Sequence, residues 1–150
     1  MPDALDDLIA RRTAIHRRRT SSRSTAAPTG DEDWSAVAAD PDRAMAAADR
    51  LGPPGADATD RAVAADLLGA VADGRPERSG DVLARLLPRA AEEPEPSVLV
   101  AVAHALGRAQ DPRTRPTLVD LADHADDAVR LAAVQGLPGA AATTDEALAT

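Results

Sequence analysis

The sequence contains no cysteine, phenylalanine or tyrosine, and Trp34 is its only aromatic residue. The lack of cysteine excludes disulfides, thiol catalysis and thiolate metal sites. Aromatic and β-branched residues favour strands, so their scarcity argues against a sheet. Charges interrupt every apolar run, which argues against a membrane span, and the N-terminus lacks the apolar segment of a secretory signal. We therefore expect a soluble, cytoplasmic protein.

Alanine dominates what is present and makes up about a quarter of the 150 residues. It is the best helix former, and its small side chain lets helices approach closely. Because each alanine buries little apolar area, at roughly 25 cal/mol per Å², the few large aliphatic residues suit a thin, extended core. All the basic residues are arginine, which is typical of a GC-rich genome and points to a bacterial source. The composition predicts an all-α fold.

Charge is divided unevenly along the chain. Residues 1–30 hold six arginines against three aspartates, and the remainder holds eleven arginines against twenty-two acids, for a net charge of −8. The Arg/Ser/Thr-rich stretch has little to bury, so residues 1–30 are predicted to be a disordered basic tail, with a short helix over residues 3–15. Alternatives for this tail are contact with nucleic acid, an anionic membrane or an acidic partner, or phosphorylation of its serines. The acidic body, residues 31–150, disfavours nucleic-acid binding, which needs clustered cations.

An internal repeat runs through the body. Residues 98–107 align with residues 129–138, and two further copies lie upstream. Each copy has an anchor leucine, and the four are Leu51, Leu68, Leu106 and Leu137. The residue after the anchor is glycine or proline, namely Gly52, Gly69, Gly107 and Pro138. Glycine or proline in that place is typical of a helix end. The column two residues before the leucine is always polar and is predicted to face water, and its members are Asp49, Asp66, His104 and Gln135.

Second helices lie between these copies. The predicted helices are near residues 33–39, 41–51, 57–72, 79–91, 96–109, 113–124, 127–137 and 144–150. Antiparallel helix pairs stacked in this way form an α-α superhelix, or α-solenoid. Residues 41–51 are interpreted as the second helix of an incomplete first repeat. Residues 144–150 begin a helix with no polar capping helix after it, which predicts a repeat array truncated at the C-terminus.

The best-matched copies contain motifs in a defined order. A helix ending Ala-Leu-Gly at Gly107 is followed by Asp-Pro-Arg-Thr from Asp111, a leucine-rich helix, and Asp-Asp-Ala-Val-Arg ending at Arg130. This order resembles a HEAT repeat and is similar to the HEAT-like repeats of the phycobilin-lyase type. The likeness is strong over residues 96–138, moderate over 57–95, weak over 31–52 and absent before residue 31. It implies that Asp111 or Asp127 and Arg130 tie neighbouring repeats together, and that the chain is an interaction scaffold rather than an enzyme.

No constellation of catalytic residues stands out. The sequence has no nucleophile elbow, phosphate-binding glycine loop or zinc-ligand spacing. His104 falls in the polar column, and both it and His124 are interpreted as solvated side chains rather than metal ligands. The acids around His124 lack the spacing of a calcium loop and are interpreted as a turn and a helix N-cap. We expect no catalytic residue, cofactor or metal.

The second helices carry the remaining candidates. Their charged side chains are predicted to line a mixed-charge concave face for a protein or peptide, with simple solvation as the alternative; they are Arg85, Arg89, Arg113, Arg115 and Asp120. Interface hot spots favour Trp, Tyr and Arg, so arginine would anchor a partner here. The predicted function is a non-catalytic HEAT-repeat scaffold or adaptor. Two alternatives remain: a DNA-contacting HEAT-like protein akin to the alkylpurine glycosylases, and an accessory lyase-type protein, which the family's name alone implies.

Overall fold

The computed structural model of the chain describes residues 3–22 and 34–140. Within these residues the chain forms α-helices and two 3-10 turns and contains no strand, which confirms the all-α prediction. The elements are α1 (Ala4–Ser22), α2 (Ser35–Ala39), α3 (Pro41–Leu51), α4 (Ala58–Gly74), η1 (Pro76–Arg78), α5 (Ser79–Glu92), α6 (Pro96–Ala109), η2 (Pro112–Thr114), α7 (Arg115–Leu121) and α8 (Asp127–Ala140). None of the helices in these ranges is long and apolar enough to cross a membrane.

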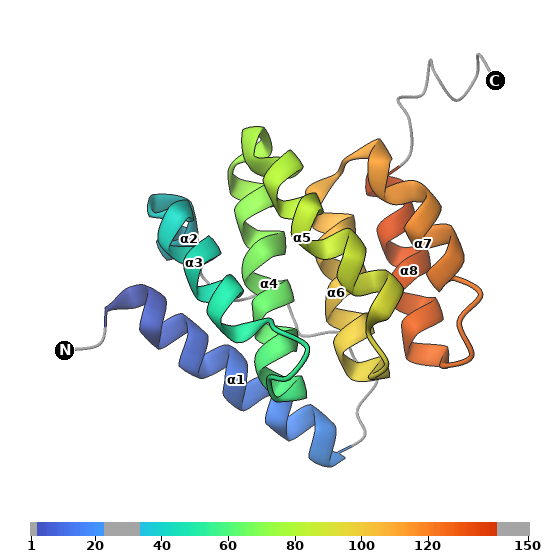
Figure 1. The fold of residues 1–150 in the computed structure, drawn as a ribbon, viewed down its shortest axis with the longest axis horizontal. Coiled ribbons are helices and arrows are strands. Elements are labelled where there is room, and N and C mark those ends of the chain that lie inside the picture. The colour runs from blue at the N-terminus through green and yellow to red at the C-terminus, as the bar shows by residue number, and fades with distance from the viewer. Residues whose placement is uncertain (1–2, 23–33, 141–150) are drawn as a thin grey trace.

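The helices form two layers (Figure 1). In the first layer, α4, α6 and α8 stack on one another in order and make the most extensive contacts in the described part of the chain. In the second layer lie α3, α5 and α7; α5 packs on both α4 and α6, and α7 packs mainly on α8. This is the α-solenoid of stacked helix pairs that the sequence predicts.

Glycines set how closely the first-layer helices approach. A Cβ atom built on Gly69 would lie 2.8 Å from the Cα atom of Ala105, and one built on Gly107 would lie 2.7 Å from the Cα atom of Gly136. Packed carbon atoms are ordinarily about 3.5–4.0 Å apart, so neither position has room for a side chain. The contact of α4 with α6 recurs one repeat later between α6 and α8, and both depend on an absent side chain.

The residue after the anchor leucine is typical of a helix end, but it ends only one of these helices, in agreement with the predicted bounds 57–72 and 96–109. Gly52 does end α3, where its N–H donates to the carbonyl of Ala48. Gly69 and Gly107 instead lie inside α4 and α6, and α8 continues past Pro138. An interior glycine costs about 1 kcal/mol relative to alanine. The close helix contact that it allows offsets this loss, so the helices run on.

The core is thin and extends along both layers. Leu68 and Leu106, the anchor leucines of the central repeats, are fully buried. Leu51 and Leu137 are partly exposed and pack against the core from nearer its ends. Three residues before the anchor, Ala48, Ala65 and Ala103 are fully buried, whereas Val134 of the last copy is 53 % exposed. The anchor leucines are therefore fully buried only in the two central copies.

The N-terminal segment differs from the predicted disordered tail. Residues 4–22 form the long helix α1, which packs on α4 and α2 (Figure 1). Leu5 and Leu8 of this helix are buried in the common core. The composition predicted disorder here, but Arg12 and His16 of α1 have a buried partner, Asp66, on α4. Residues 23–33 lie outside the described ranges.

Among the helices predicted after residue 33, the bounds differ most at the second helix of the 96–138 region. A helix is expected over residues 113–124, but the structure has the 3-10 turn η2 followed by α7, which ends at Leu121. Asp111 starts η2 by accepting a hydrogen bond from the N–H of Arg113, so the first turn is tighter than α-helix. The helix predicted over residues 144–150, and with it the predicted truncation, falls outside the described residues.

The outer side of α8 is apolar. Leu131 and Val134 are 50 % and 53 % exposed. In the repeat alignment they correspond to Val100 and Ala103 of α6, which are buried, and the carbonyl of Ala103 lies beside α8. The side of α8 that is exposed is therefore the side that, on α6, packs against the next first-layer helix.

Candidate functional site

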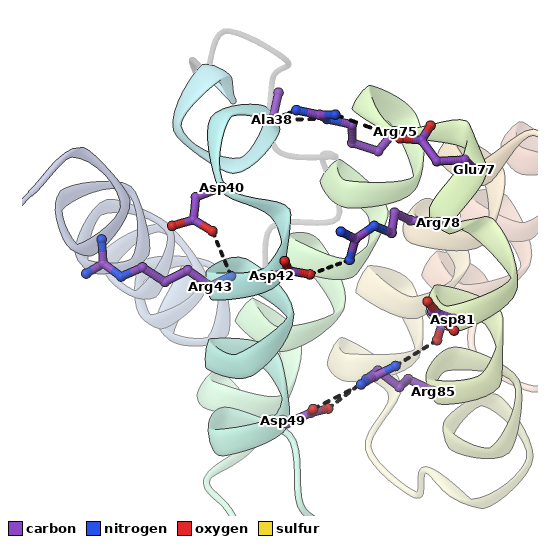
Figure 2. A network of polar contacts seen from close by, with 10 residues as sticks. All are labelled: Ala38, Asp40, Asp42, Arg43, Asp49, Arg75, Glu77, Arg78, Asp81 and Arg85. Carbon is purple, nitrogen blue, oxygen red and sulfur yellow. Dashed lines mark hydrogen bonds and ion pairs between the residues drawn. The ribbon is translucent and has the colours of Figure 1, made fainter.

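Arginines of η1 and α5 face carboxylates of α3 across the second layer (Figure 2). Arg78, at the end of η1, donates to Oδ1 of Asp42 at 2.5 Å. Arg85, two turns later, donates from Nε and Nη2 to the two carboxylate oxygens of Asp49 at 2.8 and 3.1 Å. Both pairs join residues 36 apart in the sequence, so they connect one second-layer helix to the next.

Arg85 is committed to contacts within the chain. It also donates to the carbonyl of Asp81, one turn earlier on α5 (Figure 2). The hydrogen bond from Arg85 lowers the pKa of Asp49, and the same bond raises the pKa of the guanidinium. Partly exposed pairs of this kind contribute about 0–1 kcal/mol. Arg85, predicted to bind a partner, therefore joins α3 to α5 in the free protein.

Arg89 lies one turn beyond Arg85 and has no such carboxylate. Its Nη1 atom is buried and makes no hydrogen bond. The guanidinium occupies the space that any side chain at Gly52 would need, directly over the end of α3. Burial lowers the pKa of Arg89, against the opposing effect of nearby carboxylates. Arg89 is thus a partly buried cation with an unsatisfied donor.

The two carboxylates near Arg89 already have arginine partners. Asp49 is bound by Arg85, and Glu93 accepts from Nε and Nη2 of Arg61 at 2.7 and 3.1 Å. Further carboxylates act on Arg61 and Arg85 rather than on Arg89. Arg89 therefore has no carboxylate of its own within the described residues.

The other predicted partner-binding residues lie on η2 and α7. Arg113 donates to both carboxylate oxygens of Asp111 at 2.7–3.2 Å and so has a local partner. Arg115 and Asp120 are exposed on α7, and Val119 between them is 45 % exposed. The structure thus groups Arg85 with Arg89 on α5, and Arg115 with Asp120 on α7.

A second polar cluster, which the sequence did not reveal, is buried between α1 and α4. Oδ2 of Asp66 accepts from Nε and Nη2 of Arg12 at 3.1 and 2.8 Å and lies 2.6 Å from Nε2 of His16. The side chain of Asp66 is only 9 % exposed. Burial alone raises the pKa of Asp66, but His16 and Arg12 outweigh it and hold the pKa below its ordinary value of 3.8. The prediction that this polar column faces water is therefore wrong at Asp66.

Trp34, just before α2, lies between two arginines. The Cζ atom of Arg12 is 5.4 Å from the ring centroid, and that of Arg108 on α6 is 4.7 Å away. Arginine within about 6 Å of a tryptophan ring is attracted by cation–π interaction. Because Arg12 belongs to α1, the environment of Trp34 depends on whether α1 is docked.

We expect the fluorescence of Trp34 to report undocking of α1 in acid. The folded-state pKa of Asp66 lies below 3.8, so its stabilising contribution is present above that value and is lost as the pH falls through the folded-state pKa. The emission should therefore stay constant from pH 7 to about pH 4 and change below it. With no tyrosine in the chain, the signal comes from one residue. A transition centred near pH 6 would contradict the assignment to Asp66.

The residues that form these two layers match a known family. A family model for HEAT repeats matches residues 54–138, from the loop before α4 to α8. The chain belongs to the HEAT repeat family. No curated protein and no solved structure matches it. In the HEAT stack, α4 with α5 and α6 with α7 are complete helix pairs, and α1 to α3 precede the matched region.

The contacts that the resemblance implied between HEAT repeats are local instead. Asp111 binds Arg113, two residues away, and Arg130 pairs with Asp127 and donates to the carbonyl of His124. Ion pairs between repeats join residues about one repeat apart, namely Asp42 with Arg78, Asp49 with Arg85, and Asp73 with Arg108. An Asp–Arg spacing close to the repeat length is the signal that would have found them.

The histidines of the HEAT helices have structural surroundings. Nδ1 of His124 accepts from the N–H of Asp126, whose carboxylate in turn accepts from the N–H of Ala128 at the start of α8. The acidic patch is thus the turn and helix N-cap that its sequence predicts. His104 is half-buried on α6 rather than exposed. In the described ranges, no group of three or more His, Asp or Glu side chains could hold a metal ion.

Proposed function

We propose that this HEAT-repeat chain is a non-catalytic scaffold that binds another protein through its second-layer face, the exposed surface of α5, η2 and α7. The observation that carries the proposal is the surface of α7. Val119 is 45 % exposed there between Arg115 and Asp120, which is a mixed apolar and charged composition typical of interfaces. Repeat stacks present such continuous faces to extended partners.

The same face disfavours nucleic acid. Arg78, Arg85 and Arg113 are each paired with an aspartate, so their charges are already neutralised within the chain. Binding to a phosphate backbone depends on unpaired cations that release counterions. A DNA-contacting role would need these pairs to break, and we place it second.

The repeat subtype, the cellular location and the lack of catalytic activity are also part of this proposal. We infer an adaptor of the phycobilin-lyase type of HEAT-like repeats, acting in the bacterial cytoplasm without catalytic activity. An accessory lyase role has no support from the geometry, because the second-layer face brings together guanidinium groups, carboxylates and aliphatic side chains only. A bound chromophore after purification would restore that alternative.

Site-specific photo-crosslinking tests the face directly. A photoreactive residue at Val119 or at exposed Ala84 of α5 should crosslink the same partner in cells, whereas one at exposed Ala10 of α1 should not. The double change Arg115→Glu and Val119→Asp should then weaken binding of that partner about tenfold or more, because hot-spot contacts contribute about 2 kcal/mol each. Binding would be measured by titration calorimetry.

The proposal would be overturned by crosslinks at Ala10 alone, or by equal affinity of the double variant. A gel shift with DNA at physiological salt, retained after deletion of residues 1–22, would favour the DNA-contacting alternative. Circular dichroism of each substituted variant checks that the helices are intact, since the substituted residues are exposed and the fold should not respond.

A further inference from the structure

We infer that Arg89 is the anchor of the second-layer face and that it receives a single carboxylate from the bound partner, beside Gly52 where α3 ends. The inference rests on the proposed function and adds the chemistry of what is recognised. It is carried by three features of the described residues: an unsatisfied buried donor, nearby carboxylates that already bind other arginines, and a glycine that leaves room for the guanidinium.

The unsatisfied donor is costly in the free protein. Nη1 of Arg89 is buried without an acceptor. Most buried polar groups in folded proteins have a partner, and a charged group without one is especially unfavourable. Arg85 and Arg89 are also four residues apart on one helix, where like charges destabilise the helix. A residue that stabilises the fold would not be arranged in this way, so its contact lies outside the chain.

The neighbouring carboxylates select the ligand. Asp49 and Glu93 act on Arg89 but bind Arg85 and Arg61, so Arg89 has no carboxylate of its own. One carboxylate from the partner supplies it. A phosphate group carries about −1.5 to −2 and would be repelled more strongly than a carboxylate by Asp49 and Glu93. The site therefore favours a monoanion, and a carboxylate also matches the planar fork of a guanidinium.

Access to the guanidinium is from the side of Arg89 that faces solvent. Arg89 as a whole is only partly buried, so part of the side chain faces solvent. A ligand entering there needs a side-chain rotation and no movement of the helices, and such rotamer changes are common on binding. The space over Gly52 is essential, because a side chain at position 52 would displace the guanidinium.

Titration of the isotope-labelled full-length chain, followed by NMR at pH 7 and constant ionic strength, tests this site. The signals are the Nε–Hε group of Arg89 and the backbone N–H of Gly52. Sodium acetate should shift both in the wild type in a saturable way. The Gly52 signal, which Arg89→Gln retains, should shift at concentrations at least tenfold lower in the wild type than in that variant, because hydrogen bonds to charged groups are the strong ones. Inorganic phosphate should bind more weakly than acetate. The control is Arg50→Gln, an exposed arginine of α3, which should behave like the wild type.

Three short peptides distinguish the source of the carboxylate. One is capped at both ends and has a central glutamate, the second has glutamine in its place, and the third has no acidic side chain but a free C-terminal carboxylate. Tighter binding of the first assigns an acidic side chain, and tighter binding of the third assigns a chain terminus. The inference is overturned if all three bind alike, if phosphate binds more tightly than acetate, or if Arg89→Gln responds as the wild type does.

A stability measurement separates a binding role from a structural one. Arg89→Met keeps the aliphatic stem and removes the charge, so we expect its melting temperature to equal or exceed that of the wild type by a few degrees. A clear decrease would mean that Arg89 stabilises the fold, against the inference. Because neither acetate binding nor this melting temperature involves α7, failure here leaves the crosslinking test of the proposed function unaffected.

Discussion

Replacement of Asp66 by asparagine is expected to weaken the docking of α1 by about 3–5 kcal/mol, because it leaves Arg12 buried without its counterion. Nε and Nη2 of Arg12 both donate to the same carboxylate oxygen, and the guanidinium side chain is 4 % exposed. An asparagine oxygen can still accept hydrogen bonds but carries no charge. The expected result is release of α1 with the first-layer stack intact. Hydrogen exchange of the α1 amides and the emission of Trp34 would both report it.

Asp49 provides the matched control for this experiment. It occupies the same column of the repeat as Asp66 and also pairs with an arginine, but its side chain is 52 % exposed. Asp49→Asn should cost no more than about 1 kcal/mol, since exposed ion pairs contribute little. If both variants lose the same stability, the buried cluster does not hold α1. The double change Arg12→Met and Asp66→Leu should recover much of the loss, because it removes both buried charges together.

The second large effect is expected for Gly107→Ala, which should destabilise the stack by about 1–3 kcal/mol. The added Cβ atom would lie 2.7 Å from the Cα atom of Gly136, so α6 and α8 must move apart. Both partners at this contact are backbone atoms, and neither can rotate away. Urea unfolding of the full chain measures the change in the free energy of unfolding.

Gly80→Ala makes the same chemical change in a helix without the contact. A Cβ atom on Gly80 of α5 would lie 3.9 Å from a flexible arginine tip, so there is room for it. Alanine is a better helix former than glycine by up to about 1 kcal/mol, and this variant should be as stable as the wild type or more so. The two substitutions are therefore predicted to have opposite signs. Gain of stability at Gly107 would show that α6 and α8 do not pack as described.

Repetition within the sequence made most of the stack predictable. Leu68 and Leu106 recur in the same register, and both are buried where the repeat alignment places the core. The glycine column of the same alignment is ambiguous, because glycine after an apolar run is typical both of a C-cap and of a close helix contact. Gly52 is a helix C-cap, whereas Gly69 and Gly107 allow a close helix contact. Only the neighbouring helix distinguishes them.

The sequence predicted which residues belong to the candidate site but not which side chains they contact. The sequence placed Arg85, Arg89 and Arg113 on the second helices, and the structure locates them on α5 and η2. It could not show that Arg85 and Arg113 bind aspartates of the chain whereas Nη1 of Arg89 has no acceptor. Those partners are up to 36 residues away, and their distance in space depends on how the helices stack.

The all-α fold, the repeat and its register follow from local sequence patterns, because helix propensity and apolar periodicity act over a few residues. Which members of a repeated column are covered depends on how the helices stack. Asp49 and Asp66 are equivalent in the repeat, yet α1 covers Asp66 while Asp49 stays half exposed. Burial depends on which helix lies across a position, and the repeat, being the same at each copy, carries no information about where the stack has a neighbour.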